Sequence, residues 1–290
     1  MEQDVRFDSA GRTLDGVVHT PEDLTPGERR PAFLVLHGFG SNKSAGNTVG
    51  PARMFRDWGY VTLRFDMRGC GDSEGEFGRI ICLDQVADTR AALTYMAGRE
   101  DVDGARIGVV GSSFGAAVAV YTAGVDERVA AVISSGGWGD GERKFRGQHP
   151  TQEAWTKFTD MLERGREHFE RTGESLMVDR YDIVPMPQHL RKHLAEGSVK
   201  TFPAETAQSM FDFRADDVVG DIAPRPLLLL HSSQDSVTPT EQSVELFKRA
   251  GRGADLHLFA DTDHFMFAAS NKRVHEIIKS WLDRFFPVKV

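Results

Sequence analysis

Gly111-Ser112-Ser113-Phe114-Gly115 is the stretch that decides how the rest of the chain is interpreted. It follows the apolar run 106–110, which is typical of a buried strand, and precedes the small apolar run 116–121, which is typical of a packed helix. A strand, a tight turn and a helix with serine at the apex form a nucleophile elbow, whose strained backbone raises the hydroxyl above the sheet. We expect glycines at 111 and 115 because side chains there would collide with the neighbouring strand or helix.

Composition indicates one globular domain, or one domain that carries an insertion, because 40% of the 290 residues are hydrophobic. The net charge of −8 argues against nucleic acid or an anionic membrane surface as a partner. The sequence shows no signal peptide, and no apolar run approaches the roughly 18 residues of a membrane span. Cys70 and Cys82 predict neither a disulfide framework nor a zinc site. We therefore expect a cytoplasmic protein without a bound metal.

Strand-like and helix-like segments alternate along the chain, which predicts a mostly parallel, doubly wound sheet. A hairpin is expected over 4–20, and helices over 84–98 and 272–286. Further strands are expected at 31–36, 61–65, 106–110, 129–133, 226–231 and 255–259. In such sheets ligands bind at the carboxyl ends of the strands.

Four polar residues follow the ends of predicted strands: His37, Ser113, Asp235 and His264. A serine hydroxyl is a poor nucleophile at neutral pH, so it needs a base that accepts its proton and a carboxylate that orients the base. The sequence therefore predicts Ser113 as nucleophile, His264 as base and Asp235 as the orienting acid. His37 is expected mainly to hold its loop, although it could also line the substrate pocket.

Other residues could compete for these roles, but their positions are less favourable. The rival acids lie beside His264 or before a strand: Asp261, Asp263 and Asp221. The rival bases lie within a strand, on the last helix, or at a strand end where a structural role is expected: His257, His275 and His231.

The sequence resembles the α/β-hydrolase superfamily, on the side of serine esterases similar to dienelactone hydrolases and feruloyl or cinnamoyl esterases. The stretches that carry the resemblance are HGFGSNK, RFDMRGCGDSEG, GSSFG, HSSQDSVTP and DTDHF. The resemblance implies Ser113, Asp235 and His264 as the triad, and the backbone N–H groups of Phe39 and Phe114 as the oxyanion hole. The serine departs from dienelactone hydrolase itself, which uses cysteine, and from haloalkane dehalogenases, which use aspartate.

About ninety residues separate the predicted strands 129–133 and 226–231, far more than an ordinary crossover needs. The resemblance implies a core of residues 1–138 and 220–290 with a helical cap at 139–219. Within the insertion we expect helices over 152–172 and 187–196. Trp138 directly follows a strand end and is the best candidate for the substrate pocket. The insertion could also carry a homodimer interface.

The leading hypothesis is a serine carboxyl-ester hydrolase that forms an acyl-enzyme with a small to medium acyl substrate and needs no cofactor. Thioester, lactone or C–C hydrolysis and acyl transfer could use the same triad, while peptidase activity is less favoured. A non-catalytic ligand-binding protein on this fold is the alternative of a different class. The complete triad argues against it.

Overall fold

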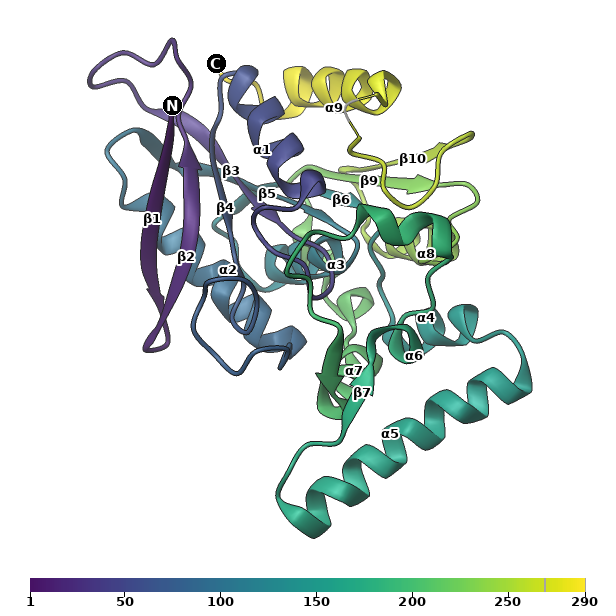
Figure 1. Cartoon of the computed structure of the whole chain (residues 1–290). Helices are drawn as coiled ribbons and strands as arrows, with labels where there is room; N and C mark the ends of the chain where they lie inside the picture. Colours follow the sequence, from purple (N-terminus) through teal and green to yellow (C-terminus); the bar gives the residue numbers. More distant parts are fainter. Residues whose placement is uncertain (269, 290) are drawn as a thin grey trace.

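The predicted alternation of strands and helices folds into one eight-stranded sheet in a computed structural model, which describes residues 1–268 and 270–289 (Figure 1). The strand order is β1-β2-β4-β3-β5-β6-β9-β10. β2 pairs antiparallel with β1 and with β4, and the other neighbours are parallel. This is the α/β-hydrolase fold that the sequence predicted. The strands span Glu2–Ser9, Arg12–His19, Arg30–Leu36 (β3), Val61–Phe65 (β4), Val102–Ser112 (β5), Val129–Ser135 (β6), Leu227–Ser232 (β9) and Ala254–Phe259 (β10).

Helices cover both faces of the sheet. Successive side chains of the central strands point to opposite faces, and those on each face belong to a separate hydrophobic cluster that the helices bury. In β3, Leu34 and Leu36 face one cluster, whereas Phe33 and Val35 face the other. The first cluster includes residues from α2 (Cys82–Ala97), α3 (Phe114–Val125) and α8 (Glu241–Arg249). The second includes residues from α1 (Gly46–Asp57) and α9 (Lys272–Phe285). Strands buried on both faces explain the continuous apolar runs of the sequence.

The chain between β6 and β9 adds a mainly helical layer, with the long helix α5 at the outer edge of the molecule (Figure 1). Helix α5 spans Gln152–Thr172, as predicted. It begins where the Thr151 side chain accepts a hydrogen bond from the Ala154 N–H, and it ends at Gly173 in the left-handed conformation. The other elements are α4 (Gly141–Gln148), β7 (Met177–Asp179), α6 (Arg180–Ile183), η1 (Gln188–His193), β8 (Thr201–Pro203), α7 (Ala204–Asp212), η2 (Ala215–Asp217) and η3 (Val219–Ile222).

One expectation for a helix needs correction. The segment 187–196 contains only the 3₁₀ helix η1, which the structure ends at His193. In α9, Val274, Ile278, Trp281 and Leu282 are buried, but Phe285 is 42% exposed. Phe285 is the last residue of α9, and the next residue, Phe286, is buried with its ring centre 5.4 Å from that of Phe33 in β3.

Candidate active site

Ser113 stands at the turn between β5 and α3 with φ 57° and ψ −116°, a strained conformation for a residue with a side chain. The predicted nucleophile elbow is therefore present. A Cβ on Gly111 would lie 2.2 Å from the carbonyl oxygen of Gly115, and one on Gly115 would lie 2.6 Å from the carbonyl oxygens of Leu36 and His37. Both glycines are thus required by the close approach of backbone, as expected.

The predicted acid and base are in direct contact. Nδ1 of His264 lies 2.8 Å from Oδ2 of Asp235, and both side chains are almost fully buried. The other carboxylate oxygen accepts hydrogen bonds from the N–H groups of Val237 and Thr238 at 2.8 and 2.7 Å. Burial alone would raise the pKa of Asp235, but the charges and hydrogen bonds of His264 and His231 hold it below its ordinary value. Asp235 is therefore ionised at neutral pH and fixes the proton of His264 on Nδ1.

His231 supports Asp235 in a way that the sequence did not reveal. Its Nδ1 lies 2.6 Å from the Ser243 hydroxyl, and its Nε2 lies 3.0 Å from the Thr238 carbonyl and 3.3 Å from Oδ2 of Asp235. Nε2 therefore faces two oxygen acceptors, the Thr238 carbonyl and the Asp235 carboxylate. The rival acid Asp263 instead accepts hydrogen bonds from the N–H and hydroxyl of Ser236, at 2.9 and 2.7 Å. Its carboxylate joins two loops and does not orient the ring of His264.

Ser113 and His264 both adjoin the end of β6. The N–H of Ser113 donates to the Ser135 carbonyl at 2.8 Å, and a Cβ on Gly136 would lie 3.3 Å from the His264 ring. The contacts of the described residues include no hydrogen bond between the Ser113 hydroxyl and His264. Such hydrogen bonds are often long in unliganded sites and tighten when substrate binds.

The loop after β3 passes beside the nucleophile. A Cβ on Gly38 would lie 3.8 Å from Cβ of Ser113, and the rings of Phe39 and Phe114 lie 6.0 Å apart. Within residues 1–268 and 270–289, the N–H groups of Phe39 and Phe114 donate no hydrogen bond. Phe114 is also the first residue of α3, where N–H groups point away from the helix. Both N–H groups are thus available to a developing oxyanion.

Arg180 of α6 donates hydrogen bonds to this loop, a contact that the sequence did not predict. Its guanidinium donates to the carbonyl oxygens of Phe39 and, at 2.7 Å, of Val199. The N–H of Val199 in turn donates to the Gly40 carbonyl at 2.8 Å. The Phe39 ring stacks on Phe202 with centres 4.3 Å apart. The insertion therefore fixes the backbone conformation of the loop that carries the Phe39 N–H.

Comparison with known proteins places this geometry in a family. A family model described as serine aminopeptidase, S33, matches residues 27–270. The chain belongs to this family of α/β hydrolases. It is 27% identical to the acyltransferase drtE of Aspergillus calidoustus, over 96% of this chain and 93% of that protein. It is similar in fold to the α/β hydrolase GrgF of Penicillium sp. sh18, with a TM-score of 0.80, 21% identity and coverage of 98% and 99%. The fold also matches Est1E of Butyrivibrio proteoclasticus, solved with ferulic acid, with a TM-score of 0.69, 20% identity and coverage of 97% and 98%.

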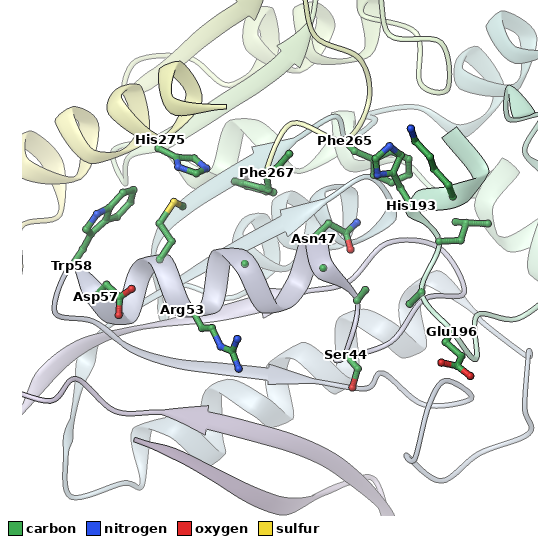
Figure 2. A pocket seen from close by; sticks show the side chains of 18 residues that line it. Ser44, Asn47, Arg53, Asp57, Trp58, His193, Glu196, Phe265, Phe267 and His275 are labelled. Atoms are coloured by element: carbon green, nitrogen blue, oxygen red, sulfur yellow. The ribbon is translucent and has the colours of Figure 1, made fainter. Parts of the chain in front are cut away.

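A large groove lies between α1, η1 and residues 265–268 (Figure 2). Its volume is about 930 Å³, and Trp58, Phe265 and Phe267 line it together with charged side chains such as Arg53. The ring of Phe265 contacts the ring of His264 edge to face, with centres 5.3 Å apart. A second cleft of about 420 Å³ reaches Asp235 from the side of α4.

The two residues proposed for the substrate pocket are both buried. Nδ1 of His37 lies 2.9 Å from the Gly38 carbonyl, and its Nε2 accepts a hydrogen bond from the Met67 N–H at 3.1 Å. Burial lowers the pKa of His37, so the ring is neutral and joins two loops, and these contacts leave it no polar atom for a substrate. Trp138 is 1% exposed and lies against Phe114 with ring centres 5.7 Å apart. Trp138 therefore contacts the residue that directly follows Ser113.

Neither a metal site nor a membrane span is found where the structure describes the chain. In those residues no group of three or more His, Cys, Asp or Glu side chains is arranged to hold a metal ion. None of the described helices has both the length and the apolar character that crossing a bilayer requires.

Proposed function

We propose that this protein is a serine carboxyl-ester hydrolase that acts through an acyl-enzyme. The observation that carries the proposal is the buried Asp235–His264 pair at the strand ends, next to a serine held in a strained elbow. Membership in a serine hydrolase family and the fold shared with Est1E support it.

In the proposed first half-reaction, Ser113 attacks the ester carbonyl while His264 accepts its proton through Nε2. Asp235 stabilises the imidazolium that forms. The N–H groups of Phe39 and Phe114 donate to the oxyanion, and His264 then protonates the leaving alcohol. In the second half-reaction water, deprotonated by His264, attacks the acyl-enzyme, and Ser113 leaves with its proton restored.

Acyl transfer is a second candidate, because the fungal relative that aligns over nearly the whole chain is named an acyltransferase. An acceptor alcohol or amine would then replace water in the second half-reaction. The groove beside His264 is large enough for an acceptor of drug-like size. Thioesters, lactones and C–C bonds remain substrates that the same residues could cleave, and the family description adds aminoacyl amides.

We further propose that residues 139–219 form a cap over the site. The contacts of Arg180 and Val199 with the loop after β3 support this assignment, because they join the insertion to the proposed oxyanion hole.

Hydrolysis of p-nitrophenyl esters from acetate to long-chain acyl groups tests the proposal. We expect wild type to release nitrophenolate and Ser113→Ala to lose this activity while it keeps its unfolding temperature. Added alcohols and an aminoacyl p-nitroanilide separate acyl transfer and aminopeptidase activity from ester hydrolysis. Equal ester hydrolysis by both proteins would disprove the role of Ser113.

A further inference from the structure

Lys144 on α4 is a buried amine that the proposed mechanism does not use. The residue is 2% exposed, and in the described part of the chain its Nζ has neither a hydrogen-bond partner nor an ion pair. A lysine ammonium carries three donors, and leaving them unsatisfied in a protein interior is costly. Such a group is rarely retained without a ligand or a chemical role.

The surroundings of the amine are aromatic on two sides. Its Nζ lies 4.7 Å from the centre of the Trp138 ring and 3.8 Å from that of Phe145. The faces of these rings attract a cation and offset part of the cost of burial. They provide no oxygen acceptor, however, and Nε1 of Trp138 is itself buried without a partner. Among the described residues, neither the Lys144 amine nor the Trp138 indole N–H has an oxygen acceptor.

Among residues 1–268 and 270–289, no acid forms an ion pair with this amine. The titratable group there whose charge would favour the ammonium is the thiol of Cys82, and burial raises the pKa of Cys82 to about 12. Burial lowers the pKa of Lys144 to about 7, so the amine can bind a proton together with an anion.

A chain of contacts links the amine to the residue that follows the nucleophile. Phe114 follows Ser113 directly, the Phe114 ring contacts Trp138, and Trp138 contacts the amine. An acyl group that extends from Ser113 along these two rings would bring its far end to Lys144.

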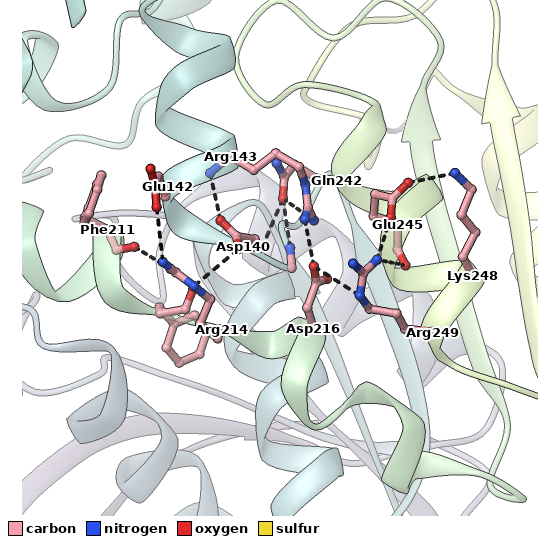
Figure 3. A network of polar contacts seen from close by, with 12 residues as sticks. Asp140, Glu142, Arg143, Phe211, Arg214, Asp216, Gln242, Glu245, Lys248 and Arg249 are labelled. Atoms are coloured by element: carbon pink, nitrogen blue, oxygen red, sulfur yellow. Dashed lines mark hydrogen bonds and ion pairs between the residues drawn. The ribbon is translucent and has the colours of Figure 1, made fainter.

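The start of α4, which carries Lys144, is held in place by polar contacts. Figure 3 shows the polar network that joins α4 to α8 and η2. Arg143 bonds to Asp216 at 2.8 Å, and Oε1 of Gln242 accepts from the N–H groups of Gly139 and Asp140 at 3.1 and 3.2 Å. This network fixes the backbone beside Lys144 against α8 and η2.

We propose that Lys144 binds a carboxylate at the far end of the acyl group, so that the preferred substrates are esters of dicarboxylic acids with one free acid group. This inference rests on the proposed ester hydrolysis. An ammonium paired with a carboxylate in a buried site forms strong, charge-assisted hydrogen bonds. Trp138 Nε1 would donate to the same carboxylate and help to orient it.

The first test compares two p-nitrophenyl esters with the same adipoyl chain, p-nitrophenyl hydrogen adipate and its methyl ester. We expect wild type to favour the free acid by about 10-fold or more in kcat/KM, since hydrogen bonds to charged groups are worth that much in binding. This ratio should collapse in Lys144→Met. Lys157→Met is the matched control, because Lys157 lies on α5 with a side chain 70% exposed, and the ratio should persist there.

The second test does not depend on turnover. Adipate is titrated into Ser113→Ala protein at about pH 8.5, in two buffers of different ionisation enthalpy. We expect binding to take up close to one proton, because the amine becomes charged only when the carboxylate arrives. Lys144→Met added to Ser113→Ala should remove both the binding and the proton uptake.

The outcomes separate the two proposals. If wild type hydrolyses the methyl ester but Lys144→Met keeps the preference for the acid, the role of Lys144 is wrong and ester hydrolysis stands. If neither ester is hydrolysed, the proposed function fails for this class, and the titration alone decides on Lys144. Adipate that does not bind, or binds without proton uptake, overturns the carboxylate site.

Discussion

Asp235→Asn is the substitution that tests the catalytic geometry most sharply, because it changes charge and donor pattern but hardly changes shape. Asp235 holds two sets of partners: the N–H groups of Val237 and Thr238 on one oxygen, and the rings of His264 and His231 on the other. An asparagine can satisfy the two N–H groups only with its carbonyl oxygen. Its NH₂ group must then face Nδ1 of His264.

The consequence is a proton on the wrong nitrogen. With an amide N–H donor opposite Nδ1, the neutral ring must accept there and carry its proton on Nε2, where it cannot receive the proton of Ser113. The variant also loses the negative charge that stabilises the imidazolium. In a serine hydrolase with this arrangement we expect kcat to fall by about 10³- to 10⁴-fold, with a much smaller change in KM.

The assay is steady-state hydrolysis of the best p-nitrophenyl ester, with thermal unfolding as a check that the variant is folded. Asp263→Asn is the matched control, since Asp263 accepts hydrogen bonds from Ser236 and from the backbone N–H of His264 but does not contact the imidazole ring. We expect that control to lose less than about 10-fold. A loss of similar size in both variants, or less than 10-fold in Asp235→Asn, would refute the assignment of the acid.

Three further predictions concern the surrounding structure. Arg180→Lys should lower kcat about 10-fold with little change in KM, because a lysine cannot hold the carbonyls of Phe39 and Val199 together; an unchanged kcat would contradict its positioning role. Lys144→Met should stabilise the fold near pH 7 by about 1–3 kcal/mol in urea unfolding, because it removes an unpaired buried amine. Since burial lowers the pKa of Lys144 to about 7, the unfolded chain binds more protons above that pH, and wild-type stability should rise relative to Lys144→Met from pH 7 to about 10.5. Gly115→Ala should destabilise by about 2–3 kcal/mol or fail to fold, measured the same way, since its Cβ would lie 2.6 Å from a backbone oxygen.

Features set by local chemistry could be predicted from the sequence. The elbow, the hairpin and the buried strands follow from glycine positions, period-two alternation and apolar runs, and the structure has them at the predicted places. The pairing of Asp235 with His264 could be inferred because parallel strands end at one edge of the sheet.

Features that depend on contacts distant in sequence could not be predicted. Arg180 lies 141 residues from the carbonyl that it holds, and a lone arginine in a polar insertion carries no signal of that contact. Lys144 lies in a short charged stretch that is typical of a solvated helix, yet tertiary packing buries it. His231 was expected to be structural, and its place beside Asp235 emerges only from the turn at 235–238.

Covalent labelling tests most directly whether Ser113 is an activated nucleophile. Wild type is treated with a fluorophosphonate, and the labelled residue is located by mass spectrometry of its peptides. We expect one adduct, on Ser113, which is absent in Ser113→Ala and forms far more slowly in His264→Ala, where no base accepts the proton. No adduct on wild type, or an adduct that persists in Ser113→Ala, would contradict the role of Ser113 as nucleophile.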